Sequence, residues 1–164
     1  MLKRGEPLRA RKTLVHSPPV SVTQYAADAP YHLTICCDRA KYGIKGDDIG
    51  RKGPLKGQCA VALLCAIQHY SSKGELNPLR AVVMPDHLHL ILCNRTDCPF
   101  DRVIVKIKKW IASRQGVVWQ RGYFDHRLRN DESFEGQSDY IAMNPVRKGL
   151  CNSPEEWPYA MRWE

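Results

Sequence analysis

The sequence has no pair of cysteines in the CxxC spacing, although seven of its 164 residues are cysteine. Structural zinc sites and redox-active thiol pairs commonly use that spacing, so neither explains these cysteines well. An odd number of cysteines also leaves at least one thiol unpaired within the chain. We therefore expect free thiols in a reducing cytoplasm.

Long apolar runs are absent as well. No stretch approaches the roughly 18 apolar residues of a membrane-spanning helix, and the first residues, Met1 to Pro7, lack the apolar run of a secretory signal. The HExxH helix of zinc proteases, the phosphate-binding P-loop and the RNP motif of RNA-binding domains are also missing. These absences argue against a membrane protein, a zinc protease and an ATP-dependent enzyme.

The charge balance is strongly basic. The chain has 25 Lys and Arg against 17 Asp and Glu, which gives a formal net charge of +8. Such a surface favours an anionic partner, and nucleic acid is the commonest one. Because 43% of the residues are hydrophobic, the chain can build a packed core, and its length suits one domain. We predict a basic, proline-rich arm over residues 1–30 and a single domain over residues 31–164.

Hydrophobic periodicity predicts alternating strands and helices in that domain. The expected strands span residues 32–37, 79–84, 87–93 and 122–128. The expected helices span residues 58–72 and 131–143, with another that begins near Pro99. The glycine-rich basic stretch 41–57 is typical of a mobile loop. This order predicts an α+β sandwich, an antiparallel sheet with helices packed mainly on one face.

His87 and His89 lie two residues apart in an otherwise apolar strand. Alternate side chains of a strand share a face, so both imidazoles point the same way with Cα atoms roughly 6.5–7 Å apart. Two rings at that spacing can hold one cation on a rigid platform. Cys93 has the same parity, so a zinc site of His87, His89 and Cys93 is an alternative.

Tyr140 lies on the polar side of the last predicted helix. At about 100° per residue, Gln137, Tyr140 and Asn144 fall on one face about 60° wide. A phenol there can attack a phosphorus atom while an amide oxygen ligates a cation beside it. Each residue also has a structural explanation, because Asn144 precedes Pro145 at a helix end and Tyr140 suits a half-buried packing position.

The candidate DNA contacts are basic side chains along one helix face or flanking the Tyr140 helix, together with one tryptophan. They are Lys106, Lys109, Trp119, Arg121, Arg127 and Arg129. The cations suit phosphates, and Trp119 suits base stacking, as do Tyr123 and Phe124. A solvated charged surface explains the same cations, and a place in the core explains the same aromatic residues.

Three stretches then occur together: MPDHLHLIL (84–92), WQRGYFDHRLRND (119–131) and DYIAMNPVRKGL (139–150). In order and spacing they resemble the single-tyrosine HUH transposases, in particular the REP-associated tyrosine transposases. The resemblance implies a ferredoxin-like or RRM-like fold, a Mg²⁺ or Mn²⁺ site at His87 and His89, and Tyr140 as nucleophile. It also implies a third ligand at Asn144, where many relatives carry glutamine. Relatives include dimers and monomers, so a homodimer is left open.

The implied function is a transposase-like nickase that cuts and rejoins single-stranded DNA with hairpin or palindromic repeats. Attack by Tyr140 would leave a 5′-phosphotyrosine and a free 3′-OH. The retained bond energy would let another 3′-OH reverse the attack without ATP. Two alternatives remain at this point: a non-catalytic single-stranded nucleic-acid-binding domain of RRM-like shape, and a zinc-dependent hydrolase.

Overall fold

The computed structural model describes residues 28–95, 97–129 and 131–163. The order of elements is β1 (Pro30–Cys36), α1 (Gln58–Ser72), β2 (Asn77–Met84), β3 (His87–Cys93), α2 (Phe100–Gln115), β4 (Phe124–Arg127), α3 (Asp131–Ala142), α4 (Asn144–Arg147) and β5 (Ala160–Arg162), with short 3-10 turns at Gly46–Asp48 and Pro154–Glu156. The predicted arm falls almost entirely outside the described residues, so the division at residue 30 stays a prediction.

The strands form one sheet in the order β4-β1-β3-β2-β5, in which every neighbouring pair is antiparallel. The first four strands with α1 and α2 make the βαββαβ arrangement of a ferredoxin-like sandwich, and β5 extends the sheet beside β2. The predicted α+β fold class is therefore confirmed. The predicted bounds of α1 and β3 agree with the structure, because strong periodicity and clear turn residues mark both elements.

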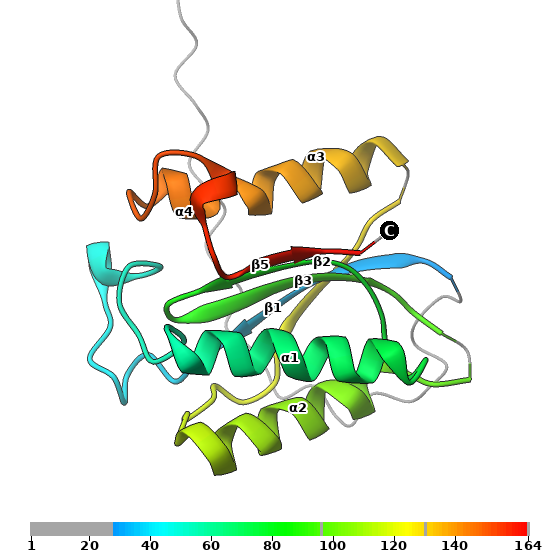
Figure 1. The fold of residues 1–164 in the computed structure, drawn as a ribbon, viewed down its shortest axis with the longest axis horizontal. Helices are drawn as coiled ribbons and strands as arrows, with labels where there is room; N and C mark the ends of the chain where they lie inside the picture. Colours follow the sequence, from blue (N-terminus) through cyan, green and yellow to red (C-terminus); the bar gives the residue numbers. More distant parts are fainter. Residues whose placement is uncertain (1–27, 96, 130, 164) are drawn as a thin grey trace, which may run out of the picture.

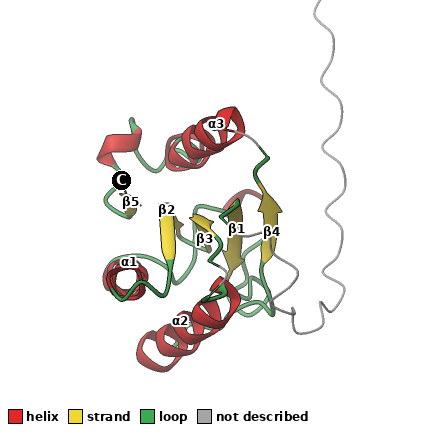
Figure 2. Cartoon of the chain, turned by 90° about the vertical axis from the view of Figure 1, so that its right-hand side faces the viewer, coloured by secondary structure: helices red, strands yellow, loops and turns green. Residues whose placement is uncertain are grey.

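The two longest helices, α1 and α2, cover one face of the sheet, and α3 with α4 covers the other (Figures 1 and 2). The main core lies under α1 and α2, where Leu88 and Leu90 of β3 belong to one buried cluster with Leu63 and Ile104. A smaller cluster lies under α3, built around Ile91 and Ile141 with their neighbours. The helices thus lie mainly on one face, as expected, and the opposite face is only partly covered.

Strand β3 is buried along almost its whole length because it lies at the centre of the sheet. Its leucines, at positions 88, 90 and 92, belong to the core on the α1–α2 side. His87 and His89 alternate with them and therefore face α3, as Ile91 does. The predicted parity of the histidine strand is confirmed, and it places both imidazoles on the less covered face.

The glycine-rich stretch expected to be a mobile loop is anchored to the turn between β2 and β3. The backbone N–H of Leu55 donates to the carbonyl of Pro85 at 2.9 Å, and Leu55 itself is fully buried. Gly53 has a φ of 154°, and a Cβ on it would lie 2.1 Å from the Pro85 oxygen. Only glycine fits this approach of two backbones. The stretch therefore packs against the start of the histidine strand.

The last helix ends near its predicted position but is followed by another helical turn. Helix α3 stops at Ala142, and α4 begins at Asn144 with Pro145 in its first turn. Proline is tolerated there because its missing N–H has no partner in a first turn. None of the helices in the described part of the chain combines the length and apolar character needed to cross a membrane.

Candidate metal and nucleophile site

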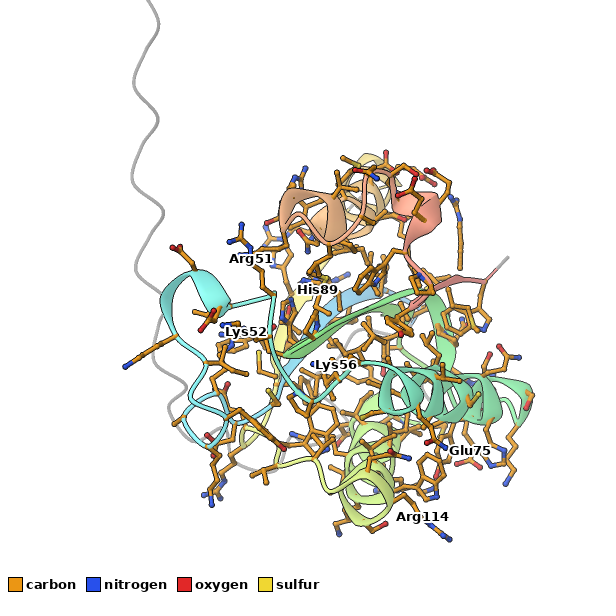
Figure 3. The ribbon with its side chains drawn as sticks, turned by 60° about the vertical axis from the view of Figure 1, so that its left-hand side comes forward. Arg51, Lys52, Lys56, Glu75, His89 and Arg114 are labelled. Atoms are coloured by element: carbon orange, nitrogen blue, oxygen red, sulfur yellow. The ribbon has the colours of Figure 1, made fainter. Side chains whose placement is uncertain are left out.

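The two histidines of β3 point at each other on the α3 side of the sheet. Their Nε2 atoms lie 3.0 Å apart, and each residue is only 8% exposed. The ring planes are nearly perpendicular, at 87°. Figure 3 places His89 between the sheet and the layer of α3 and α4. Two nitrogens at that separation match neighbouring ligands around one octahedral cation, whose bonds of about 2.1 Å at right angles put ligand atoms about 3 Å apart.

Asp86 orients the first of these rings. Its carboxylate lies 2.6 Å from Nδ1 of His87, accepts the Arg39 Nε–H at 2.5 Å and accepts the Gly50 N–H at 3.0 Å. Burial alone would raise the pKa of Asp86, but its contacts with His87 and Arg39 outweigh burial and lower the pKa. An ionised Asp86 holds the proton of His87 on Nδ1, which leaves the Nε2 lone pair free for a metal.

His89 is held as a neutral imidazole. Its Nδ1 lies 2.9 Å from Nε2 of His32 and 3.3 Å from the Thr34 hydroxyl. Burial, followed by the neighbouring His87 and His32, lowers the pKa of His89 well below its usual value. Burial, with His126 and His87, also lowers the pKa of His32 to about 4. Neutral rings are the form that binds metals, because the nitrogen lone pair is then available.

Two amide side chains of the last helical segment reach this cluster. Gln137 Nε2 lies 2.9 Å from Nδ1 of His32, and Asn144 Nδ2 lies 2.8 Å from Nε2 of His89. Rotating the Asn144 amide by half a turn brings its oxygen to the same place. The polar helix face predicted from the sequence thus lies against the histidines at the positions on either side of Tyr140.

Tyr140 itself is half exposed, with 50% of its surface accessible. The guanidinium carbon of Arg147 lies 4.6 Å from the centre of its ring, and Arg147 Nη1 donates to the Tyr140 carbonyl at 3.0 Å. Among the described residues, no hydrogen bond to the Tyr140 hydroxyl occurs. The phenol is therefore open to a substrate that approaches from solvent.

The donors gathered here fit a divalent cation. Nε2 of His87, Nε2 of His89 and the Asn144 amide converge. A proton shared between two of these atoms leaves the third without a hydrogen-bond partner in the group. Imidazole suits transition metals, and amide and phosphate oxygens suit Mg²⁺ and Mn²⁺, so this mixed set fits Mn²⁺ better than Mg²⁺. No three His, Cys, Asp or Glu side chains gather as a metal site within residues 28–95, 97–129 and 131–163. The amide, or a phosphate oxygen of DNA, has to complete the set.

The alternative zinc site is wrong in its third ligand. Cys93 lies four residues beyond His89 on the same strand, about 13 Å away along β3. Zinc–sulfur bonds are about 2.3 Å long, so one zinc ion cannot reach both side chains. Shared parity on a strand shows that two side chains lie on the same face of the sheet, but it does not show how far apart they are.

The predicted phosphate contacts on α2 lie across the sheet from the histidines, and DNA contacts there stay a prediction. Lys106 and Lys109 belong to α2, which covers the sheet face opposite to the histidines (Figure 1). Lys106 also pairs with Glu75 at 3.1 Å. Helical phase shows which residues share a helix face but not which side of the sheet the helix covers. These two lysines cannot touch a phosphate that His87 and His89 hold.

Trp119 has the core position that is the alternative to base stacking. It packs against the main core, and its Nε1–H donates to the Lys108 carbonyl at 3.0 Å. Tyr123 packs against the same core, whereas Phe124 is 37% exposed. Phe124 pairs with Thr34 of β1, which contacts His89, so Phe124 faces the histidine side. Of these three aromatic residues, Phe124 is the one exposed on the histidine side.

The three predicted arginines near β4, at positions 121, 127 and 129, are all exposed. Arg127 pairs with Tyr31, whose side chain belongs to the α1–α2 core, so Arg127 points away from the histidine face. Arg121 and Arg129 lie in the segments that flank β4. DNA contacts at these arginines stay a prediction.

Sequence reasoning missed His32 and Asp86. His32 comes from β1, and only the pairing of β1 with β3 brings it beside His89. No spacing along the chain encodes that register. Asp86 directly precedes His87 in the turn, and a carboxylate beside a candidate ligand is a signal that the sequence contained.

Comparison with curated proteins gives two relatives of the same description. The chain is 32% identical to the REP-associated tyrosine transposase of Escherichia coli (strain K12) over 82 residues, which are 48% of this chain and 50% of that protein. A protein of Haemophilus influenzae with the same description is 26% identical to the chain over 111 residues, which are 56% of this chain and 63% of that protein. The chain thus matches less than two thirds of either relative's length. No family model matches it.

Among solved structures, a REP-associated tyrosine transposase bound to a REP hairpin superposes with a TM-score of 0.68 and 23% identity, over 88% of this chain and 82% of that one. A likeness at that identity establishes the fold, and the curated relatives supply the sequence similarity. The chain is therefore similar in sequence and in fold to the REP-associated tyrosine transposases, and the resemblance seen in its three motifs is confirmed.

Proposed function

We propose that this chain is a transposase-like enzyme that nicks and rejoins single-stranded DNA, with Tyr140 as nucleophile and with His87, His89 and Asn144 as metal ligands. The observation that carries the proposal is the docking of the Tyr140 helix. Gln137 and Asn144, three residues before and four after Tyr140, contact His32 and His89. Nucleophile and metal ligands are thereby held on two elements that pack against each other.

The nucleophile has the exposure that this reaction needs. A long phosphodiester strand has to reach the phenol, and half of the Tyr140 surface is open to solvent. Its oxygen would attack the phosphorus, the bond from phosphorus to the 3′ oxygen would break, and water would take the phenol proton and protonate the leaving oxygen. The 3′-OH of a second strand would reverse these steps and release Tyr140.

The residues around the phosphate have distinct tasks. Asp86 fixes the tautomer of His87, and burial keeps His89 neutral, so that both rings present lone pairs. A Mn²⁺ or Mg²⁺ ion bound there would polarise the phosphate and offset the negative charge that develops during attack. The guanidinium beside the Tyr140 ring is placed to hold the same phosphate.

We propose DNA with a hairpin as the substrate class. The curated relatives are named REP-associated transposases, and the solved structure of the same fold holds a REP hairpin. The net charge of +8 suits a polyanion. Protein and hairpin oligonucleotides with single-stranded flanks, incubated with Mn²⁺, should give a species that survives denaturing electrophoresis, and a chelator should abolish it. Binding without that species, on several hairpins, would identify a non-catalytic DNA-binding domain instead.

A further inference from the structure

We propose that Arg51, Arg147 and Lys148 form a basic collar that holds the DNA backbone beside the scissile phosphate. The inference rests on the proposed function and adds the surface that grips the strand. Arg51 comes from the loop before α1, whereas Arg147 and Lys148 end the short helix α4. No spacing along the chain joins these segments, which lie almost a hundred residues apart.

Contacts between the two segments bring the collar together. Arg51 Nε–H donates to the Lys148 carbonyl at 3.0 Å. The Lys148 stem lies over Gly50, where an added Cβ would come within 2.9 Å of Lys148 Cε. A larger residue than glycine would therefore push Lys148 away. The collar is a packed feature of the fold and does not depend on extended side chains meeting by chance.

The collar adjoins both halves of the site. Gly50, next to Arg51, donates its N–H to Asp86, which orients His87. On the other side, Arg147 stacks on the ring of Tyr140. Figure 3 shows Arg51 on the same side of the molecule as His89, with Arg114 of α2 far from both. A phosphate at the histidines and the next phosphates along the strand would lie within reach of these cations.

The three cations also lack acidic partners within the part of the chain that the structure describes. Nearby cations do have acidic partners, because Arg39 pairs with Asp86 and Lys52 pairs with Asp48 at 2.9 Å. Protein–DNA contacts favour such uncompensated charges, because binding a phosphate then breaks no existing ion pair and releases counterions from the DNA. Guanidinium groups also match the geometry of a phosphate.

Salt dependence of binding tests the collar directly. Each cation that neutralises a phosphate contributes about 0.7 to the slope of log K against log salt for a single strand, and about 0.9 for a duplex. The measurement is fluorescence anisotropy with Tyr140→Phe protein in a chelator, so that no cleavage occurs. The probes are a single-stranded oligothymidylate and a hairpin oligodeoxynucleotide with a single-stranded extension.

We expect Arg51→Ala, Arg147→Ala and Lys148→Met each to reduce the magnitude of the slope by the amount that one phosphate contact contributes. Arg147→Lys keeps the positive charge and should keep the slope. Lys148→Met keeps the stem that packs on Gly50. The matched control is Arg114→Ala, an exposed arginine in the last turn of α2, which should leave the slope unchanged. A change of about 0.7 with both probes assigns the collar to the single strand, and a change of about 0.9 seen only with the hairpin assigns it to the stem.

Unchanged slopes in all three collar variants would overturn the proposal, as would an equal change in Arg114→Ala. Absence of binding by the parent protein would overturn both the collar and the proposed function. The two can also fail separately, because adduct formation by the unmodified protein is measured in another assay. If adducts form normally and the slopes are unchanged, only the collar proposal is wrong. If binding depends on the collar but no adduct forms, only the proposed nicking activity is wrong.

Discussion

The side-chain amide of Asn144 lies 2.8 Å from Nε2 of His89, which ties the helical segment that carries Tyr140 to the histidine strand. Met143, between α3 and α4, keeps a helical backbone with φ −78° and ψ −7°, so the face of α3 that carries Gln137 continues to Asn144. The segment is thereby docked on the face of the sheet that carries His87 and His89.

Asp86→Asn should weaken metal binding. The substitution removes the charge that holds the His87 proton on Nδ1, so an amide N–H can face the ring and favour the wrong tautomer. We expect Mn²⁺ affinity to fall about 10- to 100-fold, the usual effect of losing such an orienting carboxylate. Isothermal titration calorimetry measures the affinity, and Asp48→Asn, in an exposed pair with Lys52, is the control. Equal affinities for both variants would remove the orienting role of Asp86.

Gly53→Ala should destabilise the protein strongly. Its Cβ would lie 2.1 Å from the Pro85 oxygen, so the loop or the β2–β3 turn has to move. The φ of 154° at Gly53 adds backbone strain for any other residue. We therefore expect the free energy of unfolding, measured in urea, to fall by at least about 2 kcal/mol. Gly43→Ala is the matched control. Gly43 also has a positive φ but open space around it, and should cost about 1 kcal/mol. Similar losses at both positions would contradict the account of the anchored loop.

The metal-free protein should lose stability in mild acid. Burial lowers the pKa of His32 to about 4, below the unfolded value near 6.5, so the unfolded state binds more protons between these values. Stability contributed by neutral His32 is present above about pH 6.5 and is lost as the pH falls towards 4, by about 3 kcal/mol at pH 4. Urea unfolding in a chelator at several pH values measures it. His32→Gln should flatten this dependence, and the exposed His69→Gln should not.

Phe124→Ala should weaken binding of single-stranded DNA without affecting the fold. The ring is exposed on the histidine side of the edge strand, where a base can stack on it. We expect a loss of about 1–3 kcal/mol in binding free energy, measured by anisotropy with an oligothymidylate. The control is Trp110→Ala, an aromatic residue with 43% exposure on α2, across the sheet. A larger loss in the control would place the strand on the other face.

Local patterns predicted much of the fold and half of the site. Alternation along β3 fixed the face of His87 and His89, and helical phase grouped Gln137 with Asn144, whose contacts with His32 and His89 bear that grouping out. Such periodicities depend only on neighbours along the chain. They therefore survive folding unchanged wherever an element is long and regular.

The remaining features depend on how distant segments pair. His32 joins the cluster only through the register of β1 with β3, and Arg51 meets Lys148 only because the loop packs against α4. The sequence could not place Lys109 relative to the histidines, because no periodicity tells which face of a sheet a helix will cover. It could not place the Trp119 ring either, because burial of an aromatic ring depends on its tertiary neighbours.

The nucleophile is the central claim, and mapping the covalent adduct tests it most directly. Protein incubated with a hairpin oligonucleotide and Mn²⁺ is digested with protease and nuclease, and the modified peptide is identified by mass spectrometry. We predict a nucleotide on Tyr140, no adduct in Tyr140→Phe, and a normal adduct in Tyr70→Phe, whose ring lies on α1 across the sheet. An adduct on another residue, or an undiminished adduct in Tyr140→Phe, would contradict the account.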